Sequence, residues 1–427
     1  MRWQSATILA GLAVALLTGG PVSAGIQDQA GPVAQDVPPK RVAAVVSTYY
    51  HNSHADVICS RLLQTETLDG QGRRPRLELV SLYTDQVPEK DTSRQLAEQH
   101  GFKIYDKIAD ALTLGSGKLA VDGVLLVAEH GDYPTSKTGQ IIYPKRRLFE
   151  QVVRVFEQSG RSVPVFIDKH LADNWKDAKW IYDQSRRLQF PLMAGSSLPT
   201  LWRYPADDVS RDEPLREIVA ISYHTLDGYG FHAMEMVQCL AKRRHGGETG
   251  IAAVRCLSGE QVWEAIDAGE LDRDLLDAAI SRVKRPIRKG KTLRELSKTP
   301  ALFQMFFADG LKVSVLTCDN VLVEWAAAWR SKPGGEIHST LFYTQEARPF
   351  QHFTYLLRGV EQMIHSGKPS WPVERTLMTS GALDALLISK LQGGKRLETP
   401  YLKFAYESEF DWRQPPPPPP ERPIPGQ

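Results

Sequence analysis

The sequence predicts an α/β protein with a doubly wound parallel sheet, followed by an α+β domain with an open, mostly antiparallel sheet. From Lys40 onward, apolar β-branched runs alternate with stretches of helical period, which is typical of parallel strands joined by crossover helices. Beyond Glu213 the pattern changes to strands that favour an antiparallel sheet. A length of 427 residues indicates two domains rather than one core.

The first domain is expected over residues 40–205. Its strands are predicted at 41–47, 77–82, 103–105, 121–128, 163–167 and 191–194, and its helices at 55–64, 92–100, 108–114, 146–158 and 175–188. Gly101 and Gly160 follow two of these helices, where a left-handed C-terminal cap favours glycine. The strand at 121–128 is apolar almost throughout, so we expect it to be buried on both faces.

The second domain is expected over residues 206–410. Its strands are predicted at 217–223, 252–257, 312–317, 322–329 and 337–343, and its helices at 230–242, 353–366 and 373–391. An open sheet commonly pairs with a neighbour, so we expect a homo-oligomer that forms through this sheet.

The two ends of the chain carry segments outside these domains. Residues 1–24 have a basic residue, Arg2, near their start, continue with an apolar run at 6–17 and end in small residues at Ala24, which predicts a signal peptide and an exported, periplasmic or extracellular protein. The apolar run is too short for a stable membrane span. Residues 25–39 are expected to form a linker, and residues 411–427, with six prolines at 415–420, a disordered tail.

Charge and cysteine spacing exclude several functions. Lys and Arg number 52 against 50 Asp and Glu, so the net charge of +2 provides no field to attract nucleic acid. The basic stretch at 282–291 has no interleaved aromatic residues and is predicted to be a solvated connector. The four cysteines lack the CxxC spacing of zinc ribbons and redox pairs, and we expect Cys59 and Cys239 to be buried free thiols.

Ligands of an open α/β sheet bind beyond the carboxyl ends of its strands, so the residues there are the first candidates for a site. The segment after the first strand, 47–56, has none of the three glycines that let the pyrophosphate of a dinucleotide approach the backbone. It still offers hydroxyl and amide groups that can bind phosphate, and an acid after the second strand can bind a ribose. The candidate cofactor-binding residues are Ser47, Thr48, Asn52, Ser53, Asp85 and Glu129.

Histidines and charged residues gather at the same predicted edge. They follow the first, fourth and fifth strands and are His51, His54, Glu129, His130, Asp132, Asp168, Lys169 and His170. Imidazole and carboxylate groups ligate metals, and a lysine among them is a candidate acid or base. An alternative site would therefore hold a divalent metal such as zinc through His51, His54, His130 and His170.

Five segments of the first domain, at 77–85, 97–102, 121–124, 165–170 and 191–195, resemble the Gfo/Idh/MocA family. Members of this family join an N-terminal Rossmann domain to a C-terminal α/β sheet domain, so the resemblance implies this fold for residues 40–405. Asp168-Lys169-His170 stands where the family has Glu-Lys-Pro. The resemblance therefore implies that Lys169, beside Asp168, corresponds to the catalytic lysine.

A second motif of the family lies in the second domain. Gly230-Phe231-His232 is similar to the family's Gly-x-His helix start, which implies that His232 transfers a proton opposite Lys169. Gly228 replaces the aspartate that the family has four residues earlier. The resemblance also implies NAD or NADP as the cofactor and a small carbohydrate-like substrate.

The sequence is compatible with three functions. The first is an NAD(P)-dependent oxidoreductase for a sugar or polyol-like substrate, in which Lys169 and His232 polarise and deprotonate a hydroxyl group. The second is an exported metal-dependent carbohydrate hydrolase or lyase that uses the histidine-rich edge. The third is a non-catalytic binding protein on the same scaffold. The sequence lacks the motifs of serine hydrolases of the α/β type, P-loop enzymes and HExxH zinc proteases.

Overall fold

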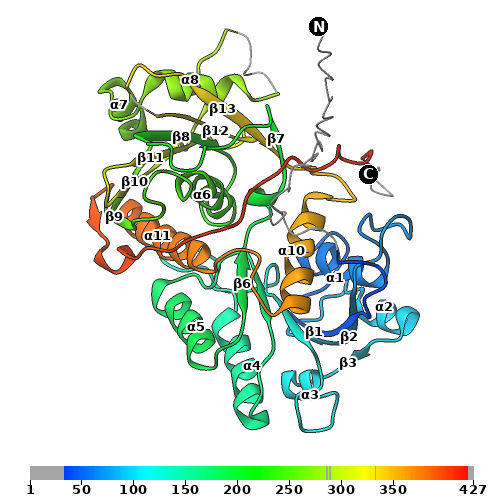
Figure 1. Cartoon of the computed structure of the whole chain (residues 1–427). Helices are drawn as coiled ribbons and strands as arrows, with labels where there is room; N and C mark the ends of the chain where they lie inside the picture. Colours follow the sequence, from blue (N-terminus) through cyan, green and yellow to red (C-terminus); the bar gives the residue numbers. More distant parts are fainter. Residues whose placement is uncertain (1–32, 285–286, 288–289, 332, 422–427) are drawn as a thin grey trace, which may run out of the picture.

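The computed structural model describes residues 33–284, 287, 290–331 and 333–421 (Figure 1). The predicted signal peptide at 1–24 and residues 25–32 of the predicted linker lie outside the described residues. Within the described part of the chain, no helix has the length and apolar character needed to cross a membrane.

The first sheet has six parallel strands in the order β3-β2-β1-β4-β5-β6. The strands are β1 (Lys40–Val46), β2 (Leu77–Thr84), β3 (Lys103–Ile104), β4 (Gly123–Val127), β5 (Val165–Asp168) and β6 (Leu192–Gly195). The strand order reverses between β1 and β4, which places the topological switch point of a doubly wound sheet there. This part of the predicted fold class is confirmed.

Helices cover both faces of this sheet. One face packs against α1 (His54–Leu63) and α10 (His352–Ser366), and the other against α3 (Ile108–Thr113), α4 (Lys145–Ser159) and α5 (Trp175–Arg187), while α2 (Ser93–His100) lies near the β3 edge (Figure 1). All five residues of β4 are buried, as its apolar run predicts. Gly101 and Gly160 adopt φ values of 80° and 58° as C-terminal caps of α2 and α4, which confirms that prediction.

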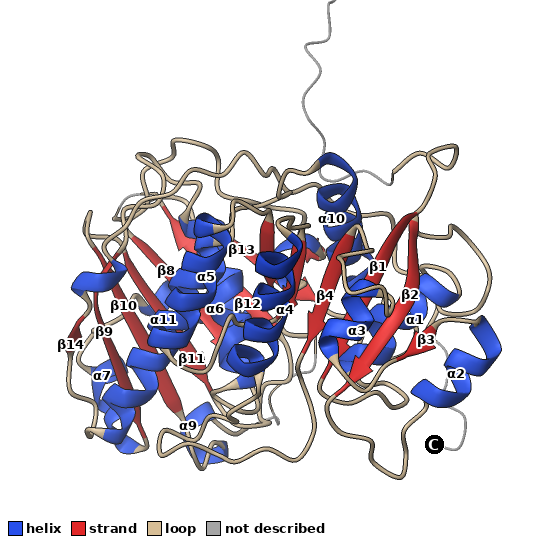
Figure 2. Ribbon diagram, turned by 90° about the horizontal axis from the view of Figure 1, so that it is seen from below, coloured by secondary structure: helices blue, strands red, loops and turns tan. Residues whose placement is uncertain are grey.

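The second sheet has eight strands in the order β14-β9-β10-β11-β8-β12-β13-β7. They are β7 (Trp202–Tyr204), β8 (Glu217–Ser222), β9 (Ile251–Ser258), β10 (Ala301–Phe307), β11 (Lys312–Thr317), β12 (Trp325–Arg330), β13 (His338–Tyr343) and β14 (Leu397–Glu398). Every neighbouring pair is antiparallel except β8 and β11, so the predicted mostly antiparallel sheet is confirmed. Figure 2 shows the two sheets side by side.

Both faces of the second sheet are covered by helices of the same chain. One face packs against α6 (Gly228–Ala241) and α11 (Glu374–Leu391), and the other against α7 (Glu260–Asp267) and α8 (Arg273–Ser281), with the short α9 (Leu293–Leu296) beyond. A homo-oligomer through this sheet remains a prediction, and the described residues offer no bare sheet face for it. All four cysteines are buried and free, as expected for Cys59 and Cys239.

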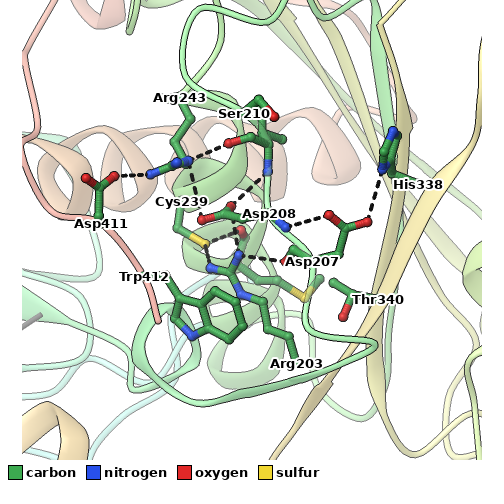
Figure 3. A network of polar contacts seen from close by, with 12 residues as sticks. Arg203, Asp207, Asp208, Ser210, Cys239, Arg243, His338, Thr340, Asp411 and Trp412 are labelled. Carbon is green, nitrogen blue, oxygen red and sulfur yellow. Dashed lines mark hydrogen bonds and ion pairs between the residues drawn. The ribbon is translucent and has the colours of Figure 1, made fainter. Parts of the chain in front are cut away.

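The C-terminal segment 411–421 lies along β7 and the end of β13, whereas the sequence predicts a disordered tail over 411–427. Trp412 donates its indole N–H to the carbonyl of Leu201 at 2.7 Å, and Trp202 donates to the carbonyl of Pro416 at 2.6 Å. The guanidinium of Arg203 lies 4.2 Å from the Trp412 ring, and Figure 3 shows these two side chains beside the polar network that includes Asp411. A polyproline segment leaves its carbonyls free, so side-chain donors of the domain can hold it.

Candidate functional site

The centre of the site is a buried carboxylate between two ammonium groups at the carboxyl edge of the first sheet. Glu129 follows β4, and its Oε1 lies 2.7 Å from Nζ of Lys145, the first residue of α4. Its Oε2 lies 3.3 Å from Nζ of Lys169, which follows β5. Burial alone would raise the pKa of Glu129, but the charges of Lys145 and Lys169 bring that pKa well below its usual value. Glu129 is therefore ionised at neutral pH.

Lys169 reaches from the first sheet to the start of α6. Its backbone has a φ of 61°, a left-handed conformation that residues other than glycine rarely adopt. A Cβ atom at Gly228 would lie 3.3 Å from Nζ of Lys169, so the absence of a side chain there leaves space for the ammonium. Burial would lower the pKa of Lys169, but the charges of Glu129 and Asp168 raise it above the usual lysine value. Lys169 is thus a permanent cation and hydrogen-bond donor.

His232 lies one helical turn after Gly228 on α6, a rise of about 6 Å. Its Nδ1 is 2.6 Å from Oγ of Ser196, and Ser196 also accepts a hydrogen bond from the backbone N–H of Leu198 at 3.1 Å. Removal from water and the charge of Lys169 lower the pKa of His232 well below its usual value. Lys169 Nζ and a neutral His232 thus both lie at the first turn of α6. Their action as one proton-transfer pair stays a prediction.

The remaining predicted residues of this edge are held by close polar contacts. Asp168 accepts from Nδ1 of His54, the first residue of α1, at 2.6 Å. Lys145 donates to Nδ1 of His170 at 3.0 Å and to the backbone carbonyl of Asp168 at 2.8 Å. Burial and the charge of Lys145 lower the pKa of His170 to about 3, so His170 stays neutral.

The rings of His54 and His130 lie 5.2 Å apart, but the four histidines of the alternative metal site do not form one ligand group. His51 is half exposed and 4.0 Å from Asp56, while His54 and His170 are engaged with Asp168 and Lys145. The buried Nε2 of His130 has no hydrogen-bond partner. Among the residues that the structure describes, no three His, Cys, Asp or Glu side chains form a group that could hold a metal ion. The metal alternative therefore finds no support.

Several polar groups at the start of α1, the phosphate-binding position of a doubly wound fold, already bind one another. The carboxylate of Asp56 accepts from the backbone N–H of Asn52 at 2.8 Å and pairs with Arg348 at 2.9 Å. Ser53 caps the helix through the N–H of Asp56, and the hydroxyl of Ser47 donates to the carbonyl of Glu129 at 2.7 Å. Thr48 has a buried hydroxyl with no partner. A pyrophosphate at this helix end would face the Asp56 carboxylate.

The ribose-binding position after β2 is filled as well. Asp85 accepts from Arg147 at 2.6 Å, from the hydroxyl of Tyr133 at 2.8 Å and from that of Tyr83 at 3.1 Å. Burial would raise the pKa of Asp85, but the hydrogen bonds from Arg147 and Tyr133 lower it. With three donors already on the carboxylate, the residues of this edge do not fit a dinucleotide bound in the usual pose, with ribose on this acid and pyrophosphate on α1.

No family model matches the sequence, and no curated protein is similar to it. Among solved structures, GenD2 from gentamicin A biosynthesis in complex with NAD is similar at a TM-score of 0.55 and 13% identity, covering 86% of this chain and 98% of that one. Myo-inositol dehydrogenase from Lactobacillus casei in complex with NAD(H) and myo-inositol is similar at a TM-score of 0.53 and 10% identity, and the match covers 84% of this chain and 97% of that one. A probable dehydrogenase from Thermotoga maritima is similar at a TM-score of 0.52 and 13% identity, and the match covers 85% of this chain and 99% of that one.

These likenesses show the fold. Their two-domain architecture agrees with the Rossmann-like domain and the second sheet domain that the resemblance implies for this chain. At such low identity they carry no residue roles.

Two residues of the site are not predicted from the sequence. Lys145 lies beyond an insertion between β4 and α4, and no local motif marks it. Ser196 follows β6, so the rule that sites form at the carboxyl ends of strands could have found it.

Proposed function

We propose that this chain is an enzyme for a sugar or polyol-like substrate, with Lys169 and His232 as its proton-transfer pair. The observation that carries the proposal is the position of a charged Lys169 and a neutral His232 around one turn of α6. The ammonium can donate a hydrogen bond to a substrate hydroxyl or carbonyl oxygen, and the neutral imidazole can accept the proton that leaves. Glu129 holds the ammonium, and Ser196 holds the imidazole.

Oxidoreduction is the first form of this proposal. It is supported by fold neighbours that were crystallised with NAD, one of them an inositol dehydrogenase with its polyol. NAD or NADP would then be the cofactor, and its nicotinamide would accept a hydride from the carbon that bears the hydroxyl. The filled positions at Asp56 and Asp85 do not support the usual pose of that cofactor.

Proton transfer without redox chemistry is the second form, and the filled nucleotide positions favour it. When a C–H bond next to a carbonyl breaks, its proton goes to His232 and its electron pair stays on the substrate as an enolate that Lys169 stabilises. If the carbon that lost its proton also bears a hydroxyl group, that hydroxyl proton moves to the enolate oxygen and the proton on His232 goes to the former carbonyl carbon, which completes an isomerisation that consumes no oxidant. Export of this enzyme is part of the proposal and rests on residues 1–24 alone.

The experiment is a reaction screen with inositols, aldoses, ketoses and aldonates in D2O. Proton NMR detects deuterium that enters a C–H bond, and NADH absorbance, with NAD or NADP added, detects oxidation. We expect one substrate to react with the wild type and not with Lys169→Met or His232→Gln, while the exposed His245→Gln serves as the control. A reaction that both site variants retain would contradict the proposal, as would a wild type that turns over none of the panel.

A further inference from the structure

We infer that segment 130–144, the insertion between β4 and α4, occupies the space of the dinucleotide and that the site works without one. The inference rests on the second form of the proposed function, proton transfer without redox chemistry, and goes beyond it by assigning a role to this segment. A dinucleotide in a doubly wound sheet lies across the carboxyl ends of the strands at the switch point, here between β1 and β4. Segment 130–144 makes its contacts across this same edge of the sheet.

The base of the segment is closed by the buried ion pair of Glu129 and Lys145. These residues stand immediately before and after it, and their side chains are 2% and 1% exposed. The segment also closes on itself, because Ser136 donates its backbone N–H to the carbonyl of Gln140 at 2.7 Å and Ile142 donates to that of Pro134 at 2.8 Å. A loop tied in this way has a defined shape.

One side of the segment is fixed to the end of β2. Besides the Tyr133 to Asp85 hydrogen bond, the side chain of Gln86 donates to the carbonyl of Asp132 and accepts from its N–H, both at 2.8 Å. Gly131 permits this contact, because a Cβ atom there would lie 2.5 Å from the Tyr133 ring and 3.0 Å from Oε1 of Gln86. These contacts place the segment on the acid that would bind the adenosine ribose.

The other side of the segment reaches the second domain. The backbone N–H of Ile141 donates to Oδ2 of Asp227, the residue before α6, at 3.0 Å. The segment thus extends from the end of β2 to the start of α6, where Lys169 lies. With the Asp56 carboxylate at the start of α1, it leaves a dinucleotide neither its ribose acid nor its phosphate-binding turn.

The test measures nucleotide binding to the full chain. Titration calorimetry detects the binding, and hydrogen exchange of segment 131–142 shows whether the segment responds to it. We expect the purified protein to contain no nucleotide, to show no saturable binding of NAD, NADH, NADP or NADPH up to about 1 mM, and to keep the same exchange in the segment with and without NADH. Stoichiometric nucleotide in the purified protein would overturn the inference. So would saturable binding that changes exchange in the segment, because the segment would then be a movable cover.

Gly131→Ala provides the matched variant, since its Cβ forces Tyr133 away from Asp85. We expect at least tenfold faster exchange at 131–134 in this variant, and Gly139→Ala, where a Cβ meets nothing within 4 Å, is the control for positive-φ strain. Unchanged exchange in Gly131→Ala would contradict the anchoring. Deuterium incorporation into the substrate measures the proton transfer independently of nucleotide binding. Failure of this inference and failure of the proposed function are therefore distinguishable.

Discussion

Oε1 of Glu129 lies 2.7 Å from Nζ of Lys145, and neither side chain has appreciable contact with solvent. The other carboxylate oxygen of Glu129 pairs with Lys169. One buried anion therefore links the start of α4 to the lysine that reaches α6. The stability of the first domain and the position of Lys169 depend on the same pair of residues.

Lys145→Met should destabilise the protein by about 3–5 kcal/mol, because it leaves a buried carboxylate with one of its two cations. Urea unfolding at neutral pH measures this loss. The double variant Glu129→Gln with Lys145→Met removes both charges and should recover part of it. A single variant as stable as the wild type would contradict the buried pairing.

His130 and His170 should each make stability increase with pH between 5 and 6.5. Burial, followed by the nearby charges of His54 and Lys169, lowers the pKa of His130 to about 4, and the pKa of His170 is about 3. Below pH 6.5 the unfolded chain binds protons that the folded chain does not, so each histidine costs about 1.4 kcal/mol per pH unit. Glu129 does not oppose this slope, since its stabilisation is lost only as pH falls below 4.5.

The slope can be checked by urea midpoints at pH 5 and 6.5. His130→Asn should reduce it by about 1.1 kcal/mol per pH unit on average over this range, whereas the exposed His245→Asn should leave it unchanged. Equal slopes in His130→Asn and the wild type would show that His130 titrates normally in the folded protein.

Ser196→Ala should slow the proton transfer about tenfold without unfolding the protein. The hydroxyl of Ser196 is the partner of Nδ1 of His232, and one hydrogen bond of about 1.4 kcal/mol corresponds to that factor. The rate of deuterium incorporation into substrate measures the effect, with Ser196→Thr as the variant that retains the hydroxyl. If Ser196→Ala and Ser196→Thr are equally slow, the hydroxyl does not orient His232.

Trp412→Ala should release the C-terminal segment. It removes the stacking on Arg203 and the hydrogen bond to the carbonyl of Leu201, which together contribute about 1–3 kcal/mol. Limited proteolysis should then cut within 411–421 in the variant before the wild type is cut. Equal cleavage of Trp412→Ala and wild type would contradict the attachment.

Much of the fold could be predicted from the sequence because its strands and helices differ clearly in apolar period. The carboxyl-edge rule also placed Glu129 and Lys169 at one site, since the strands before them are consecutive in the chain and adjacent in the sheet. β10 was missed because the apolar run at 301–307 has no alternation that separates a strand from a buried helix.

The rest of the site depends on contacts between distant residues, which no local pattern shows. Tyr133 reaches Asp85 across 48 positions, and Arg348 reaches Asp56 across 292. The missing glycines after β1 indicated an altered nucleotide position, but they did not reveal which groups fill it. The C-terminal segment was predicted from composition alone, which does not identify the tryptophans that hold it.

The pKa of His232, measured by histidine NMR in the wild type and in Lys169→Met, tests most directly that these two residues form one centre. His232→Gln assigns the signal. We expect a wild-type pKa of His232 well below 6.5 and a higher pKa in Lys169→Met, because the ammonium that disfavours the imidazolium is gone. A pKa near 6.5 that does not change in Lys169→Met would contradict it.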